Sequence, residues 1–107
     1  MNEKLKRIYV PMTETAFYIL FCLREGMHGY NIIQEVQNMT NNQLIIAPGT
    51  MYGTLSKMEK DGLINFMKRE DNRKIYKISQ LGQKILDIEL KRIERIYLNS
   101  KGVRYEG

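Results

Sequence analysis

The chain has 107 residues, of which 43% are hydrophobic and 27% charged, and it carries a formal net charge of +5 at pH 7. This length suits one domain with one modest core, and the ordinary balance of apolar and charged residues excludes a fibrous or disordered chain. The basic charge permits an anionic partner, such as DNA or a membrane surface, without requiring one. Because no apolar run approaches the roughly 20 residues that span a bilayer, we expect a cytoplasmic protein with no membrane segment.

Nothing in the sequence indicates catalysis or metal binding. Cys22 is the single cysteine and lies in an apolar run, so we expect a buried thiol and not a disulfide or a metal ligand. His28 is the single histidine, and no serine or cysteine stands at a familiar motif spacing from it, so a capping or packing role is expected. The sequence therefore predicts a protein that is not an enzyme and holds neither cofactor nor metal.

The first predicted helix covers residues 13–25. Apolar residues at positions 16, 17, 20 and 23 follow helical spacing. Thr13 is suited to cap the N-terminus of this helix, and Gly26 is suited to end it. Because residues 17–23 are apolar nearly all round, we expect this helix to lie at the centre of the domain.

A second helix is predicted from about residue 29 to residue 39, again with an apolar stripe. The polar residues 40–43 then break the pattern, and the short β-branched run at residues 44–46 predicts a brief strand. A third helix, at residues 48–61, begins with a proline and is about three turns long. Its apolar positions Met51, Leu55 and Met58 share one face, and Gly62 is suited to end it.

After residue 62 the apolar period changes from near 3.6 to 2, which predicts a β-hairpin with its turn at Asp71 and Asn72. Ser79 is suited to cap a last helix, which should run to about Asn99. This order predicts an α+β, mainly helical fold: a winged helix-turn-helix in residues 1–79, including an N-terminal extension, followed by a C-terminal dimerisation helix and tail in residues 80–107.

In such a domain the third helix is the one presented to DNA and the hairpin is the wing. Hydroxyl, aromatic and lysine side chains outside the apolar face of that helix suit contact with phosphates, sugars and base edges. The helix N-terminus also favours a phosphate near Gly49. Residues 48–78 contain seven basic and four acidic residues, so much of the chain's excess positive charge lies there. A merely solvated helix face is the alternative interpretation.

Four stretches in order carry a resemblance to a known family: His28-Gly29-Tyr30, Pro48-Gly49-Thr50-Met51-Tyr52, Glu59-Lys60-Asp61-Gly62-Leu63 and Arg73-Lys74-Ile75-Tyr76. With these stretches, residues 13–86 resemble the PadR family of bacterial transcriptional regulators. The resemblance implies a homodimeric winged-helix repressor that binds an inverted-repeat operator in double-stranded DNA and releases it when a small-molecule effector binds. It also implies that Tyr52 reads DNA, with Tyr30 near the DNA surface and a basic pair in the wing. The predicted DNA contacts are Tyr30, Gly49, Thr50, Tyr52, Thr54, Lys57, Lys68, Arg73 and Lys74.

The last helix predicts a dimer independently, because one of its sides has the 4-3-4 apolar spacing of a coiled-coil seam. The predicted interface comprises Leu5, Ile8, Tyr9, Leu86, Leu90, Ile93 and Tyr97. An effector pocket is expected at that interface near Tyr9, Phe17, Phe21 and Tyr97. Two alternatives stay open: the last helix folds back onto its own domain, or the winged helix is a protein-interaction adaptor without a specific DNA site.

Overall fold

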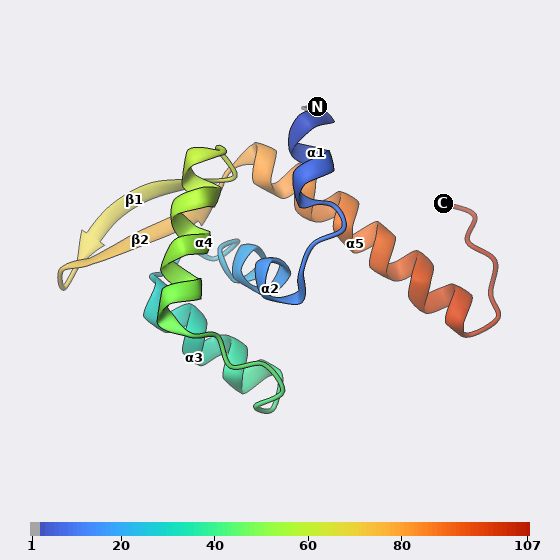
Figure 1. Ribbon diagram of the computed structural model, residues 1–107, viewed down its shortest axis with the longest axis horizontal. Helices are drawn as coiled ribbons and strands as arrows, with labels where there is room; N and C mark the ends of the chain where they lie inside the picture. Colours follow the sequence, from blue (N-terminus) through green and yellow to red (C-terminus); the bar gives the residue numbers. More distant parts are fainter. Residues whose placement is uncertain (1–2) are drawn as a thin grey trace.

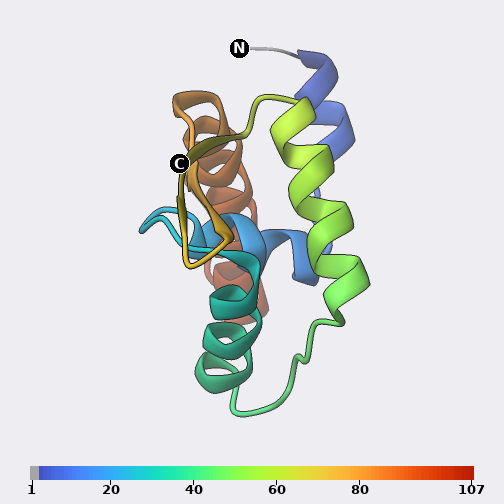
Figure 2. The same ribbon diagram turned by 90° about the vertical axis from the view of Figure 1, so that its left-hand side faces the viewer.

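The computed structural model describes residues 3–107. Within this range the chain forms, in order, α1 (Glu3–Tyr9), α2 (Glu14–Cys22), α3 (Gly29–Met39), α4 (Pro48–Lys60), β1 (Ile64–Glu70), β2 (Arg73–Ile78) and α5 (Gln80–Ser100) (Figure 1). Helices α1 and α4 follow one another along one side of the molecule, and α3 and α5 lie on the other (Figure 2). No helix in residues 3–107 is both long enough and apolar enough to cross a membrane.

Helices α2, α3 and α5 each begin with a side-chain cap. Thr13 Oγ1 accepts a hydrogen bond from the Ala16 N–H at 3.1 Å, and Ser79 Oγ accepts one from the Gly82 N–H at 3.0 Å. His28 Nδ1 accepts from the Asn31 N–H at 3.2 Å, at the start of α3. Each bond satisfies one of the backbone donors that a helix leaves unpaired at its N-terminus. The capping roles predicted for Thr13 and Ser79 are confirmed, and of the two roles expected for His28, capping or packing, the structure shows the cap.

The core forms around α2, as predicted from its nearly continuous apolar character. Buried side chains of α2 meet the inner faces of α3, α4 and α5, and together with neighbouring residues they form one cluster: Ile19, Leu20, Leu23, Ile32, Val36, Met51, Leu55, Met58, Leu63, Ile64, Ile85 and Leu86. Since α4 has only 13 residues, this burial holds it in helical form and fixes which of its sides face outward.

The wing is a two-stranded antiparallel sheet. Asp71 and Asn72 form its turn with left-handed backbone angles, φ 50° and 63°, which are suited to a tight hairpin. The predicted hairpin and its turn are confirmed. Met27 adds an isolated bridge to Tyr76, so the loop before α3 is tied to the second strand of the wing.

Three predictions of secondary structure differ from the structure. The strand predicted at residues 44–46 is wrong: this segment is an irregular loop, in which Ile46 reaches the core while Ile45 is exposed. The helix predicted over residues 13–25 ends at Cys22 and continues as turns up to Gly26. The N-terminal segment was not predicted as helical, yet it forms α1, where Leu5 and Tyr9 pack against the core.

Helix α5 extends beyond the body of the domain (Figure 1). Its first turns close the core, and Leu86 is fully buried there. The placement of Leu86 on a dimer surface is therefore corrected, because Leu86 has no surface left to offer a partner. Further along, exposed apolar side chains line the helix: Leu90, Ile93, Ile96 and Tyr97. Of the predicted N-terminal interface residues, only Ile8 is substantially exposed.

Candidate nucleic-acid interface

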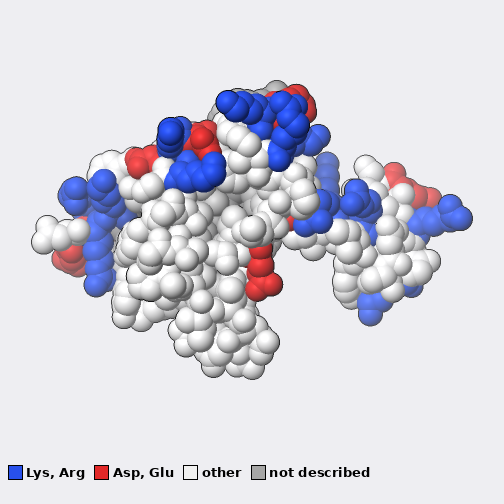
Figure 3. All heavy atoms as spheres, in the orientation of Figure 1, with Lys and Arg blue, Asp and Glu red and all other residues white. Residues whose placement is uncertain are grey.

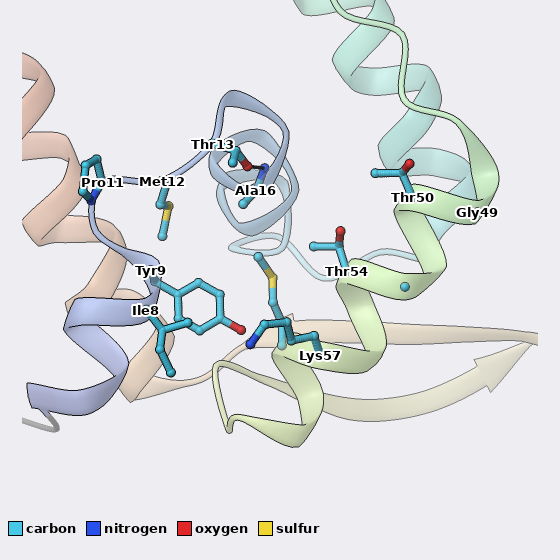
Figure 4. A pocket seen from close by; sticks show the side chains of 12 residues that line it. Ile8, Tyr9, Pro11, Met12, Thr13, Ala16, Gly49, Thr50, Thr54 and Lys57 are labelled. Atoms are coloured by element: carbon cyan, nitrogen blue, oxygen red, sulfur yellow. Dashed lines mark hydrogen bonds between the residues drawn. The ribbon is translucent and has the colours of Figure 1, made fainter.

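Helix α4 presents two different flanks on either side of its buried face. One flank, with Tyr52 and Ser56, borders a groove toward the wing, which we call the wing-side groove. The other, with Thr50, Thr54 and Lys57, borders a pocket toward α1, which we call the α1-side pocket (Figure 4). The helical spacing of Met51, Leu55 and Met58 produces this division, because their burial turns the intervening residues to the two sides.

The wing-side groove combines an exposed aromatic ring with cations. It has a volume of about 330 Å³ and is lined by His28, Gly29, Tyr52, Leu55, Ser56, Asn72, Arg73, Lys74 and Tyr76. Tyr52 is about half exposed, and no carboxylate lines the groove. Within residues 3–107, neither Arg73 nor Lys74 takes part in an ion pair. Their charges are therefore available to an anionic partner such as a phosphate.

Three consecutive residues at the start of α3 shape this groove. Tyr30 supports Arg73, whose guanidinium lies 4.9 Å from the centroid of the tyrosine ring, and the His28 ring stacks on Tyr30 from 6.4 Å. A Cβ on Gly29 would lie 2.8 Å from the ring of Tyr52, so only glycine leaves room for that ring. Burial and the nearby Arg73 lower the pKa of His28 below its ordinary value. The neutral imidazole is also the form that can accept the capping hydrogen bond.

On the α1-side flank, the lysine is already paired with a carboxylate of the same chain. Lys57 Nζ lies 2.9 Å from Asp61 Oδ2, and the Tyr9 hydroxyl donates to the same oxygen at 2.7 Å. The ammonium also lies 5.1 Å from the centroid of the Tyr9 ring. Hydrogen bonds from Lys57 and Tyr9 hold the pKa of Asp61 below its ordinary value, whereas burial and Asp61 raise the pKa of Tyr9. The charge of Lys57 is thus already offset inside the protein.

The N-terminal part of α4, residues 48–56, carries no charge, and we call it the front of α4. No residue in the stretch from Pro48 to Ser56 is ionisable except Tyr52, and the surface over the lower part of α4 is correspondingly uncharged, whereas charged side chains lie over its upper end, over the wing and near α1 (Figure 3). Gly49 and Gly53 leave this front without side chains, since a Cβ at either position would meet nothing within 4 Å. Small and hydroxyl-bearing residues of this kind suit close approach to another surface.

The structure brings the predicted DNA contacts together only in part. Tyr30, Tyr52, Arg73 and Lys74 gather around the wing-side groove, whereas Thr54 and Lys57 lie on the opposite flank. Lys68, in the wing, pairs with Glu70 at 3.3 Å, and both side chains are well exposed. Sequence reasoning missed Gly29 and Asn72 as groove residues. His28 and Gly29 are far from the wing in the sequence, so no local pattern indicates that they contact it.

The residues predicted for an effector pocket do not share one cavity. The rings of Phe17 and Phe21 stack at 5.8 Å on α2, but Tyr9 faces α4 and Tyr97 is exposed on α5. Phe17 does border a hollow with Leu90 and Ile93. Among residues 3–107 no three His, Cys, Asp or Glu side chains are grouped so as to hold a metal ion. Cys22 is buried, and burial raises its pKa to about 11.

The sequence model of the transcriptional regulator PadR-like family matches residues 19–88, well over half of the chain. The chain belongs to the PadR-like family. That family is one of transcriptional regulators and not of enzymes. The matched residues include α3, α4 and the wing, so they contain the whole wing-side groove.

Curated relatives match parts of the chain. Transcriptional regulator YqjI of Escherichia coli (strain K12) is 27% identical over 73 residues, which are 68% of this chain and 35% of that protein. Uncharacterized protein X of Lysinibacillus sphaericus is 34% identical over 68 residues, which are 60% of this chain and 62% of that protein. The chain thus spans about a third of the length of the E. coli relative.

Solved structures share the fold. A transcriptional regulator from Clostridium thermocellum has a TM-score of 0.70 at 24% identity, covering 92% of this chain and 95% of that one. Bacillus subtilis PadR in complex with operator DNA has a TM-score of 0.66 at 22% identity, covering 73% of this chain and 47% of that one. The mainly helical winged-helix fold predicted from the sequence is confirmed.

Proposed function

We propose that this PadR-like chain is a sequence-specific regulator that binds double-stranded DNA through α4 and the wing. The observation that carries the proposal is the wing-side groove, where the exposed ring of Tyr52 lies beside Arg73 and Lys74 and no carboxylate lines the surface. In the proposed docking, the front of α4 enters the major groove while Arg73 and Lys74 contact phosphates. Gly49, Thr50 and Tyr52 then face the bases or the backbone near the helix N-terminus.

The structure of B. subtilis PadR in complex with operator DNA, which shares the fold, supports DNA as the partner. A regulator must reach the chromosome, so the proposal places the chain in the cytoplasm. We further propose that it acts as a repressor, released by a small-molecule effector, as the family resemblance implies. Lys57, Thr54 and Lys68 contribute less to the docking than the groove residues, since Lys57 and Lys68 are already paired with carboxylates.

The proposed regulator is a homodimer that pairs through α5. Leu90, Ile93 and Tyr97 are exposed at coiled-coil spacing on the part of α5 that extends beyond the domain. A soluble monomer rarely leaves such a continuous apolar face in water, and a second copy of the same helix would cover it about a two-fold axis. The dimer would place its two α4 helices about 34 Å apart, which suits successive major grooves of an inverted repeat.

Selection of bound duplexes from a random DNA pool tests the docking. At about physiological salt, the purified protein should enrich an inverted repeat whose half-sites lie about one helical turn apart. The Arg73→Ala variant should enrich the same repeat more weakly, because the contact that it loses is to phosphate. Binding without enrichment, fading steeply with salt, would leave only a basic surface and would favour the protein-interaction adaptor.

The pairing through α5 has its own test in solution. Ile93→Lys places a charge in the proposed seam and should convert the dimer into a monomer, measured by sedimentation velocity. Asn99→Lys adds the same charge on the opposite side of α5, where Asn99 is exposed, and should leave the dimer intact. Equal sedimentation of both variants and the parent would contradict pairing through this face.

A further inference from the structure

The α1-side pocket lies between α4 and the N-terminal segment. It has a volume of about 420 Å³, within the range of pockets that hold small molecules (Figure 4). Residues from three consecutive parts of the N-terminal segment, α1, the loop after it and the start of α2, form one wall, and α4 forms the other. The lining residues are Ile8, Tyr9, Pro11, Met12, Thr13, Ala16, Gly49, Thr50, Gly53, Thr54, Lys57 and Met58.

The walls of the pocket are mainly apolar. Ile8, Met12 and Met58 contribute aliphatic and thioether surface from both sides, and the ring of Tyr9 closes one end. Methionine side chains adapt their shape to an apolar or aromatic occupant. Gly53 widens the hollow, because a Cβ there would meet nothing within 4 Å. Glycine destabilises the helix by about 1 kcal/mol relative to alanine, and the space that it leaves in the pocket is a functional reason for its presence.

The polar groups of the pocket favour an uncharged occupant. Asp61, at the Tyr9 end, already pairs with Lys57 at 2.9 Å and accepts the Tyr9 hydroxyl at 2.7 Å. An anion would have to compete with Asp61 for Lys57, and a cation would meet Lys57 itself, so desolvating either charge would find little compensation. The hydroxyls of Thr50 and Thr54, on α4, can instead hydrogen-bond to a neutral polar group.

We propose that the α1-side pocket binds a neutral, largely apolar small molecule carrying a hydrogen-bonding group, and that this molecule competes with DNA for α4. The second part rests on the proposed function. The pocket and the front of α4 share Gly49, Thr50 and Gly53. A molecule that fills the hollow therefore stands beside the residues that approach DNA. Release of DNA would follow from this direct overlap and would require no change in the proposed dimer interface on α5.

A matched pair of fluorescent probes tests the site without DNA. N-phenyl-1-naphthylamine is neutral, and 8-anilino-1-naphthalenesulfonate has the same rings with an added sulfonate. Titrated into the full chain, the neutral probe should bind more tightly than the anionic one. Tighter binding of the sulfonate at the same site would overturn the neutral class of ligand.

Two variants test whether the neutral probe binds in the α1-side pocket. Ile8→Ser removes apolar surface from an exposed wall residue, and Gly53→Leu partly fills the hollow, so each should weaken binding of the neutral probe about fivefold or more. Ile45→Ser is the matched control, since Ile45 is an exposed isoleucine outside the pocket. Circular dichroism checks that each variant is folded. Equal affinity of Ile8→Ser, Gly53→Leu and the control for the probe would overturn the assignment of the site.

Competition is measured with a duplex that the random pool has enriched. Adding this duplex should displace the neutral probe from the parent protein, and saturating probe should raise the apparent Kd for the duplex. Simultaneous binding of both would overturn the competition while leaving the proposed DNA-binding function in place. If no duplex is enriched, the proposed function fails, but the probe titration with Ile8→Ser still decides whether the pocket binds its ligand.

Discussion

The two flanks of α4 belong to one short helix, yet they differ in how their charges are satisfied. On the wing side, Arg73 and Lys74 border a groove without a carboxylate, and Arg73 is held over the ring of Tyr30. On the α1 side, Lys57 is neutralised by Asp61. A cation left without a partner inside its own protein is suited to an external anion, whereas a paired cation mainly stabilises the fold.

The difference shows that net charge alone does not locate a binding surface. Lys57 and Arg73 contribute equally to the formal charge of the chain, and both were predicted to contact DNA. Only the tertiary structure shows that Tyr9, far from Lys57 in the sequence, donates to the carboxylate that Lys57 contacts. The variants below test whether the two flanks really have separate roles.

The largest expected difference comes from a matched pair of glycines. A Cβ at Gly29 would lie 2.8 Å from the Tyr52 ring and 3.1 Å from Met51, whereas a Cβ at Gly53 would meet nothing within 4 Å. Gly29→Ala should therefore destabilise the protein by about 1 kcal/mol or more through overpacking. Gly53→Ala should stabilise it by about 1 kcal/mol through helix propensity. Urea denaturation of both variants measures the difference, and equal stabilities would show that Tyr52 is not held against α3.

A second comparison concerns the two cations. Arg73→Ala should weaken DNA binding about tenfold at ~0.1 M salt and reduce the salt slope by about one counterion. Lys57→Ala should weaken binding by less than about threefold, because Asp61 already offsets that charge. Anisotropy titrations of the enriched duplex at several salt concentrations provide both numbers. Equal losses in the two variants would remove the distinction between the flanks.

Removing the Tyr9 hydroxyl should loosen the α1-side flank. Tyr9→Phe deletes the hydrogen bond to Asp61 and should lower the free energy of unfolding by about 1 kcal/mol, since the acceptor is a partly buried carboxylate. Tyr105→Phe is the control, because the Tyr105 hydroxyl makes no hydrogen bond within residues 3–107 and Tyr105 lies outside the α4 flanks and the proposed dimer seam. A stability loss shared by both variants would indicate a general effect of the substitution.

The same flank has a defined pH dependence. Because hydrogen bonds from Lys57 and Tyr9 lower the pKa of Asp61 in the folded state, the stabilisation is fully present above the unfolded pKa of about 4. It is lost as the pH falls through the lower, folded pKa. Denaturation curves between about pH 5 and pH 2 should therefore show a smaller loss of stability in Tyr9→Phe than in the parent. Parallel curves would contradict this coupling.

The smallest expected effect concerns the cap of α3, next to the wing-side groove. His28→Ala removes the acceptor for the Asn31 N–H and should cost about 0.5–1 kcal/mol, while His28→Asn should retain most of the cap. Burial and Arg73 lower the pKa of His28, so its contribution is complete above about pH 6.5 and is lost as the pH falls through the folded pKa. Thermal unfolding at about pH 7.5 and pH 5 should show this dependence in the parent and not in His28→Asn.

Local signals in the sequence predicted most of the elements. The caps at Thr13 and Ser79, the apolar spacing of α4 and the turn at Asp71-Asn72 each depend on neighbouring residues, so they could be read without tertiary information. The strand prediction at residues 44–46 failed because a β-branched run can also anchor a loop. Burial of Ile46 accounts for the apolar character of this segment. The short helix α1 has only 7 residues, too few for a repeating apolar pattern to reveal it.

The candidate site was less predictable, because it depends on contacts between distant segments. Apolar spacing along the last helix continues unbroken from Leu86 to Leu90, and only burial separates the core residue from the exposed one. Similarly, the spacing of α4 shows that Tyr52 and Lys57 avoid the core but not which neighbour each one faces. The α1-side pocket needs the position of the N-terminal segment, which no local pattern specifies.

The uncharged front of α4 has a consequence for how the protein would find its site. Since no cation lies between Pro48 and Ser56, the attraction that holds the chain loosely on any DNA comes from the wing and the helix ends. Scanning along the chromosome would then depend on ionic strength, while the time spent on a matching sequence would depend on neutral contacts that salt hardly screens. We therefore expect added salt to shorten the scanning of unrelated DNA more than it shortens the residence time on the operator.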